Sequence, residues 1–92
     1  MKTLTKAQVV AKVKNQGSWT GYIAPSKINE ANIRGGWHLG MQVTVNATQV
    51  DSGIEPTVNL TDGVYSLDYF VEHFKHANCS KETGTTVKFW EE

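Results

Sequence analysis

The sequence predicts an α+β fold, a two-layer sandwich in which an antiparallel sheet of about four strands carries two helices on one face. Three observations predict it. Two segments carry apolar residues at helical spacing behind a hydroxyl residue, four segments are rich in strand formers, and the order along the chain is α-β-β-β-α-β. With 92 residues, we expect a single domain over residues 1–92 with one small core.

The first helix is expected at residues 6–16. Thr5 and Gln8 match the capping box, in which each side chain bonds the backbone amide of the other residue. Three valines then fall on one side of the helical wheel, and Gly17 suits the left-handed conformation that ends many helices. The pattern therefore predicts a capped amphipathic helix.

Strands are expected at residues 18–24 and 37–46. The first is ended by Pro25, which lacks the amide that a sheet ladder needs. The second alternates most regularly, so we expect it at the centre of the sheet, with Gly40 marking a bulge or a close approach of backbone. Its apolar positions, predicted to face the core, are Trp37, Leu39, Met41, Val43 and Val45.

The C-terminal half continues with a short strand at residues 57–61, after the turn-forming segment 51–56. Ser66 is expected to cap a second helix that ends near Ala77. The buried stripe of this helix is predicted to be Leu67, Phe70, Val71 and Phe74. A last strand is expected at residues 85–90, and either this strand or the one at 57–61 is expected at an edge of the sheet.

Charge is distributed unevenly although the total is zero. Residues 1–45 carry six lysines and arginines against one acid, whereas residues 46–92 carry three against eight. If the fold separated these halves, the molecule would have a large electric dipole, whereas interleaved strands would cancel most of that dipole.

The single cysteine, Cys79, cannot form an internal disulfide and fits a reducing compartment. The N-terminus lacks the apolar stretch of an export signal, and no apolar run is long enough to span a bilayer. We therefore expect a cytoplasmic protein with no membrane contact.

Residues 25–40 contain three glycines, which invites comparison with phosphate-binding loops, whose backbone amides approach an anion. The pattern differs from the glycine signatures of nucleotide sites because Met41 and Gln42 replace the lysine and the hydroxyl residue, and a strand follows where a helix should begin. We expect instead that Gly35 and Gly36 supply positive φ angles for a turn.

The loop before that turn is the first candidate contact surface. Ser26 is expected to cap one helical turn that projects polar residues outward, while Ile28 and Ile33 attach the loop to the body. With two lysines of the first helix, these polar residues are predicted to meet an acidic protein surface or a nucleic-acid backbone. The predicted contact residues are Lys12, Lys14, Lys27, Asn29, Asn32 and Arg34.

The outer face of the second helix is the other candidate contact surface, formed by Tyr69, His73 and His76 at i, i+4 and i+7. The two histidines and Cys79 also follow steps of three, a spacing that raises the question of a metal. A structural zinc needs a fourth ligand, and Cys79 falls beyond the expected helix end, so we expect neither a metal nor a cofactor.

No catalytic group is predicted, because no serine or cysteine is combined with a histidine and an orienting acid in a recognisable pattern. Nucleic acid is the alternative partner. The basic N-terminal half places Trp19, Tyr22 and Trp37 near its cations, and such mixtures contact phosphates and stack on bases. The α-β-β-β-α order also resembles that of the double-stranded-RNA-binding domain, but Asp68 and Glu72 stand where that module has cations, so the similarity is one of topology.

In its size, single-domain build and lack of catalytic groups, the chain resembles the small cofactor-free proteins with which phages and mobile elements block host defence complexes, the anti-CRISPR proteins among them. This resemblance implies a non-enzymatic inhibitor that occludes a protein or ribonucleoprotein complex of the host cell, with no small-molecule substrate. No sequence motif carries the resemblance, so the contact residues above follow from surface reasoning alone. The alternative is a nucleic-acid-binding module that uses the basic N-terminal half.

Overall fold

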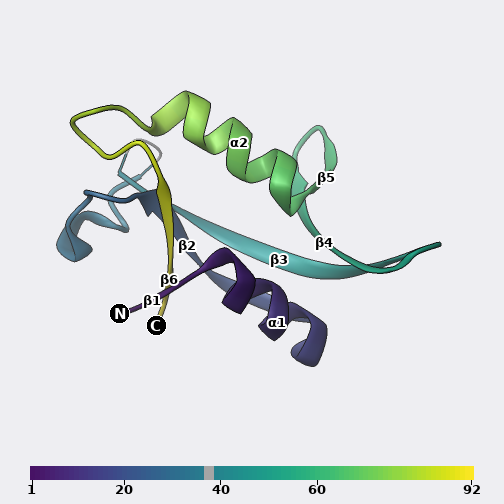
Figure 1. Ribbon diagram of the computed structural model, residues 1–92. Coiled ribbons are helices and arrows are strands. Elements are labelled where there is room, and N and C mark those ends of the chain that lie inside the picture. Colours follow the sequence, from purple (N-terminus) through teal and green to yellow (C-terminus); the bar gives the residue numbers. More distant parts are fainter. Residues whose placement is uncertain (37–38) are drawn as a thin grey trace.

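The computed structural model describes residues 1–36 and 39–92 and has an α+β fold with one antiparallel sheet (Figure 1). The helices are α1 (Lys6–Gln16), the short 3-10 helix η1 (Glu30–Asn32) and α2 (Leu67–Asn78). The strands are β1 (Lys2–Leu4), β2 (Ser18–Pro25), β3 (Met41–Val50), β4 (Gly53–Leu60), β5 (Gly63–Ser66) and β6 (Val87–Glu91). The α+β class and the antiparallel sheet are thus confirmed.

The predicted strand number and element order are wrong. The described sheet has six strands in the order β1-β6-β2-β3-β4-β5, and the chain runs β-α-β-β-β-β-α-β. Sequence analysis missed β1 and β5, whose three and four residues are too few to show an alternation. These two strands form the edges, so β4 and β6, predicted as candidate edge strands, both lie inside the sheet. Because β1 pairs with β6, the two termini lie side by side (Figure 1).

Two inner strands are shifted from their predicted positions. The strand predicted at 37–46 occupies Met41–Val50, and its first two predicted residues, Trp37 and His38, lie outside the described part. Leu39, predicted to face the core, lies in a turn with 36% of its surface exposed. The turn arises because the amides of Leu39 and Gly40 both bond the carbonyl of Gly36, at 3.0 and 2.7 Å.

The hairpin that joins β3 to β4 is tighter than predicted. Residues 51–56 were expected to form the turn, but only Asp51 and Ser52 do so, and β4 already begins at Gly53 with a φ of 129°. Ladder pairing continues through Glu55 and Pro56, which lie opposite Thr48 and Ala47 of β3. The strand predicted at 57–61 is therefore the second half of a longer one.

Both helices begin as predicted. The Thr5 hydroxyl accepts from the Gln8 amide at 3.1 Å, and the Gln8 side chain accepts from the Thr5 amide at 2.8 Å, which completes the capping box. Gly17 ends α1 with a φ of 89° and donates its amide to the Val13 carbonyl. Ser66 caps α2 by accepting from the Tyr69 amide at 3.1 Å.

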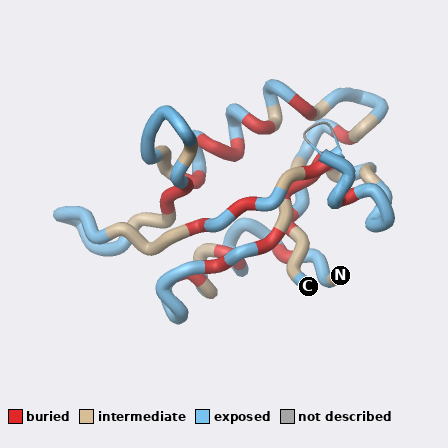
Figure 2. Tube along the Cα trace, turned by 180° about the vertical axis from the view of Figure 1, so that it is seen from behind, coloured by how far each residue is buried: buried red, intermediate tan, exposed pale blue. Residues whose placement is uncertain are grey.

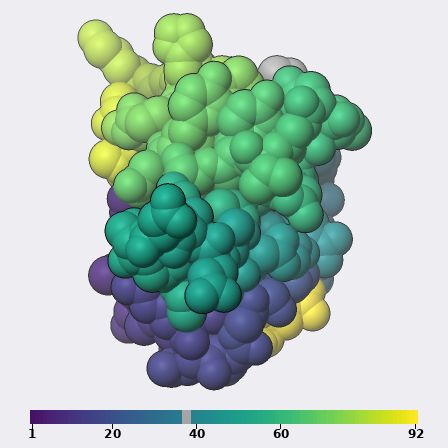
Figure 3. Space-filling model, turned by 90° about the vertical axis from the view of Figure 1, so that its right-hand side faces the viewer, coloured from purple at the N-terminus to yellow at the C-terminus, as the bar shows by residue number. Residues whose placement is uncertain are grey.

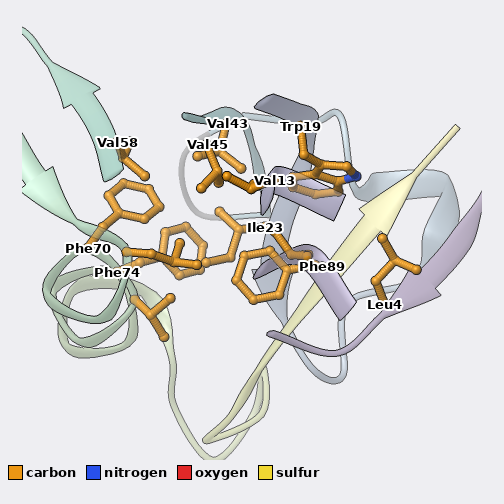
Figure 4. Packing of buried hydrophobic residues seen from close by; sticks show 13 residues of the cluster. Leu4, Val13, Trp19, Ile23, Val43, Val45, Val58, Phe70, Phe74 and Phe89 are labelled. Atoms are coloured by element: carbon orange, nitrogen blue, oxygen red, sulfur yellow. The ribbon is translucent and has the colours of Figure 1, made fainter. Parts of the chain in front are cut away.

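One face of the sheet carries the hydrophobic core (Figure 4). Two rows of directly opposed strand residues form it: Leu4, Phe89 and Ile23 in one row, and Trp19, Val45 and Val58 in the other. The helices contribute Val9, Val13, Leu67, Phe70, Val71 and Phe74 to the same cluster. Each fully buried side chain of this kind stabilises the fold by about 1.5–3 kcal/mol, so the core holds both helices on this face.

The opposite face of the sheet carries neither of the two long helices. Both helices belong to the single core cluster, and Lys6 of α1 forms an ion pair with Asp68 of α2, so the predicted placement of both on one face is confirmed. Thr20 and Thr44 lie opposite each other on the other face, are exposed, and bond through their hydroxyls at 3.0 Å. The alternation of buried and exposed residues along the central strands is visible in Figure 2. Neither α1 nor α2 covers this face; the loop that carries Arg34 lies over Tyr22 at one end of it, where Ala24 is fully buried, and the central threonines stay exposed.

Candidate functional site

The open face carries two aromatic side chains that lie directly opposite each other on neighbouring strands. Tyr22 of β2 pairs in register with Trp90 of β6, and both are half-buried. Successive side chains of a strand point to opposite faces of the sheet. Tyr22 and Trp90 are next to the core residues Ile23 and Phe89, so their side chains point away from the core. Directly opposed cross-strand residues have Cβ atoms about 4.5–5.5 Å apart, so these two aromatic side chains form one apolar spot on this face.

Arg34 reaches over this spot from the loop between η1 and β3. Its Nε donates to the Tyr22 hydroxyl at 3.4 Å, and its guanidinium carbon lies 5.6 Å from the centre of the tyrosine ring, within cation–π range. The same guanidinium forms an ion pair with Glu92, just beyond β6. The loop, β2 and the end of β6 therefore hold one arginine in a defined position. We call Tyr22, Arg34 and Trp90 the sheet-face cluster.

A pocket of about 380 Å³ opens beside the sheet-face cluster. Its lining consists of Tyr22, Arg34, Gly36, Gly40, Met41 and Gln42. Gly36 has a φ of 114°, which confirms one of the two positive angles predicted at this turn, but Gly35 has none. At Gly40 an added Cβ would lie 2.3 Å from the Ile33 carbonyl oxygen, so the predicted close backbone approach is confirmed. The pocket offers a ring, a guanidinium and an amide from a rigid rim.

The predicted contact loop is exposed, but its side chains are tied to the body. Lys27 is exposed and donates its ammonium to the Lys81 carbonyl at 3.2 Å. The predicted cap at Ser26 is wrong, because Asn29 caps η1 by accepting from the Ala31 amide at 3.1 Å, whereas Ser26 donates its amide to the Thr86 carbonyl. Asn32 is exposed at the end of η1.

Ile33 attaches this loop to the body as predicted, since it is fully buried, while Ile28 is half-buried. The polar residues of the loop thus project from an anchored segment, although several of their polar atoms are already engaged within the chain.

The two lysines of α1 that were predicted to join the loop lie elsewhere. Lys12 forms an ion pair with Glu91 at 3.2 Å, and Lys14 is exposed in the last helical turn. Glu91 faces the helix side of the sheet like Phe89, whereas Arg34 lies with Tyr22 on the open face. Lys12 and Arg34 therefore do not form one surface.

Glu91 also accepts a hydrogen bond from the indole nitrogen of Trp19 at 3.0 Å. This bond and the one from Lys12 hold the pKa of the Glu91 carboxyl below its usual value, against a small opposing effect of burial.

The charge asymmetry of the sequence is largely cancelled in the fold. Three cations of the N-terminal half pair with acids of the C-terminal half: Lys6 with Asp68, Lys12 with Glu91 and Arg34 with Glu92. The cancellation occurs because β1 and β2 flank β6, which brings the ends of the chain together. The fold therefore pairs half of the six lysine and arginine side chains of residues 1–45 with acids of the C-terminal half.

The second predicted surface is present and larger than expected. The rings of Tyr65, Tyr69 and His73 form a stack, with centroids 5.1 Å apart for the first pair and 6.4 Å for the second. Tyr69 is 59% exposed, and His73 and His76 are exposed as predicted. Tyr65 was missed because it lies before the helix, in β5, a strand that the sequence analysis did not predict. We call Tyr65, Tyr69 and His73 the ring ladder.

His73, His76 and Cys79 do not form a metal-binding group. Within residues 1–36 and 39–92, no three histidine, cysteine, aspartate or glutamate side chains gather as metal ligands would. Cys79 instead points its thiol toward the Thr86 carbonyl, with a sulfur–oxygen distance of 3.7 Å. Burial raises the pKa of this thiol, and the nearby Lys75 opposes the shift.

Sequence analysis predicted the exposure of the aromatic residues less accurately than that of the charged residues. Trp19, named as a stacking residue for bases, is 4% exposed and belongs to the core, and Trp37 lies outside the described residues. Trp90 was overlooked as a contact residue, although its alternation with Phe89 indicated that it faces away from the core. Tyr22, named with Trp19 for the same role, is half-buried and points away from the core.

No protein-family model, curated protein or solved structure matches this chain significantly. None of the described helices is both long and apolar enough to cross a bilayer. Function is therefore inferred from the geometry of the chain itself.

Proposed function

We propose that this is a non-enzymatic binding protein that inhibits a host macromolecular complex by occupying part of its surface, as do the anti-CRISPR proteins that it resembles in type. The observation that carries the proposal is the sheet-face cluster, on the sheet face that neither α1 nor α2 covers, beside a pocket. Aromatic and arginine side chains dominate the energy of many protein interfaces, and groups held in place before binding lose little entropy on association. The cluster therefore serves as the anchor, with the loop around it.

The pairing of charges favours a protein as the direct partner. Nucleic-acid binding depends largely on lysine and arginine side chains that neutralise phosphates. Here Lys12 and Arg34 already have carboxylate partners, and Arg34 is oriented by Glu92 and Tyr22 rather than extended into solvent. A partially neutralised guanidinium beside two aromatic rings suits a mixed polar and apolar protein surface.

The proposal is tested by affinity capture with matched variants. Wild-type protein, the double variant Tyr22→Ala/Arg34→Ala and the control Asn15→Ala, at an exposed position of α1 outside every proposed site, are immobilised and exposed to host lysate, and the captured proteins are quantified by mass spectrometry. We expect one complex to be retained by the wild type and the control and reduced at least tenfold by the double variant, because hot-spot residues cost about 2 kcal/mol or more when truncated. Circular dichroism verifies that all three remain folded. Equal capture by the double variant would show that the sheet-face cluster is not part of the interface.

The loop is tested separately with the identified partner. Substituting Lys27 and Arg34 together by alanine is expected to weaken binding and to flatten its dependence on salt, because two cations leave the interface. Isothermal titration at low and high salt measures both effects. Unchanged affinity in this double variant would count against the loop.

The alternative function is binding of single-stranded nucleic acid across the same face. One observation favours it: Tyr22 and Trp90 lie directly opposite each other on neighbouring strands, with Arg34 beside them, and bases stack on aromatic rings and on guanidinium planes. Fluorescence anisotropy of a labelled single-stranded oligonucleotide at low salt tests it. Saturable binding that weakens as salt rises and is lost in Tyr22→Ala supports the alternative, whereas no binding at low salt excludes it.

A further inference from the structure

The ring ladder has features that the proposed function does not use. It lies on β5 and α2, on the helix side of the molecule, whereas the sheet-face cluster lies on the opposite side of the sheet. Figure 3 shows residues 60–76, in green, covering the upper part of one end of the molecule, above the hairpin of β3 and β4 in teal. A ligand at the ladder would therefore not compete with a partner on the sheet face.

A small pocket opens beside the ladder. Its volume is about 90 Å³, and its lining consists of Leu60, Asp62, Tyr65, Tyr69 and His73. Three of the five lining residues carry rings, one is aliphatic, and one bears a carboxylate. Aromatic walls with a nearby negative charge are the surroundings that bind a cation through the electron-rich ring faces and the carboxylate.

The carboxylate of this pocket has no cationic partner. Nearby Asp68 pairs with Lys6, and Glu72 lies 3.9 Å from Lys75, but no ion pair of the described residues involves Asp62. Asp62 lies near the Tyr65 hydroxyl, and hydrogen bonding to this carboxylate is the largest of the effects that raise the pKa of the tyrosine. Its negative charge therefore remains available at the pocket.

The charge of the surrounding segment is also negative. Residues 60–76 contain three acids and one lysine, so a cation would be attracted toward this end of the molecule. An anion or an acidic peptide would be repelled.

We propose that this pocket binds an alkylammonium group, and specifically the end of a lysine side chain, methylated or not, presented by a partner protein. The size of the pocket distinguishes this occupant from a free metabolite. Pockets that bury whole small molecules enclose about 300–1,000 Å³, and this pocket is several times smaller. It accommodates one side-chain end, while the rest of the partner stays outside.

The proposal is tested by nuclear magnetic resonance titration of the isotope-labelled full chain with three probes. They are choline, its uncharged carbon analogue 3,3-dimethylbutan-1-ol, and a short peptide with one central trimethyl-lysine. We expect saturable shift changes at Asp62, Tyr65, Tyr69 and His73 with both cations. The uncharged analogue should bind about two- to fivefold more weakly, because cation–π attraction at an exposed site changes affinity by about that factor.

Two variants locate the site, and a third serves as control. Asp62→Asn keeps the shape and a turn-forming residue before Gly63 but removes the charge, so cation affinity should fall about threefold. Tyr69→Ala removes the most exposed ring of the ladder, which packs little against the core, and should abolish measurable binding of choline. Tyr22→Ala, on the opposite face, should leave cation binding unchanged.

Each contrary outcome overturns a defined part of the proposal. Equal affinity for choline and its uncharged analogue would mean a merely apolar pocket and would refute cation recognition. Binding of choline without binding of the lysine peptide would refute a protein side chain as the occupant. Shift changes that persist in Tyr69→Ala, or their absence in the wild type at tens of millimolar probe, would refute the site itself.

Discussion

Gly21 lies in the middle of β2, where the backbone and one core ring leave no room for a side chain. A Cβ added at this position would lie 2.3 Å from Cζ2 of Trp19 and 2.4 Å from the carbonyl oxygen of Trp90. The second contact is with the backbone of β6, which cannot withdraw without weakening its pairing with β2. Substituting Gly21 by alanine therefore forces the two strands or the indole ring to move.

The sign of the stability change distinguishes this steric conflict from the general effect of replacing glycine. At a position without conflict, alanine stabilises by about 0.4–1 kcal/mol because the unfolded chain loses conformational freedom. Overpacking in a core costs about 1–3 kcal/mol. We therefore expect Gly21→Ala to lower the free energy of unfolding by about 1–2 kcal/mol, which corresponds to a melting temperature lower by about 5–15 °C in a domain of this size.

Urea unfolding followed by circular dichroism measures the free energy, and an unchanged m-value verifies that the same surface unfolds. A double-mutant cycle with Trp19→Phe identifies the ring as one source of conflict. The smaller ring should relieve part of the strain, so the two changes together should destabilise by less than their sum. A Gly21→Ala variant as stable as the wild type, or more stable, would refute the packing of Trp19 over β2.

Three further predictions concern the helix cap, an acid and the cysteine. Thr5→Ala should lower the free energy of unfolding by about 1 kcal/mol through loss of the capping box, whereas Thr3→Ala at an exposed position should stay within about 0.5 kcal/mol; equal effects would contradict the cap. The pKa of Glu91 is lower in the folded than in the unfolded chain, so its contribution to stability is present above the unfolded value of about 4.3 and is lost as pH falls through the folded value. Glu91→Gln should therefore lose less stability than the wild type between pH 7 and pH 3 in urea titrations, and an identical loss would contradict the Trp19 and Lys12 contacts. Because burial raises the pKa of Cys79, iodoacetamide at pH 8 should alkylate the folded protein more slowly than the protein in urea, and similar rates would show an open thiol.

Local signals in the sequence were sufficient for the helices and the long strands. Thr5, Gly17 and Ser66 act within one helical turn of their own position, and their patterns therefore predicted the ends of α1 and α2 correctly. The alternation along β2 and β6 likewise depends only on neighbouring residues. By contrast, β1 forms because Leu4 pairs with Phe89 of β6. This pairing joins the two ends of the chain, so no local pattern in the sequence indicates it.

The candidate sites divide in the same way. The exposure of Arg34, Tyr69 and His73 followed from their positions in a loop and on the polar side of a helix. The sheet-face cluster could not be predicted in this way, because Tyr22, Arg34 and Trp90 come from three separate segments. Asp62 lies beside the ring ladder only because the turn between β4 and β5 places it in the same pocket.

The sequence by itself determined the α+β class, the two capped helices and the buried face of strands such as β2 and β6, because these depend on interactions between residues a few positions apart. Only the tertiary structure decided that six strands share one sheet, that the charges of the two halves neutralise each other, and that an arginine lies over a tyrosine beside a pocket. These features depend on which strands become neighbours, and that order is set by how the whole chain buries its core.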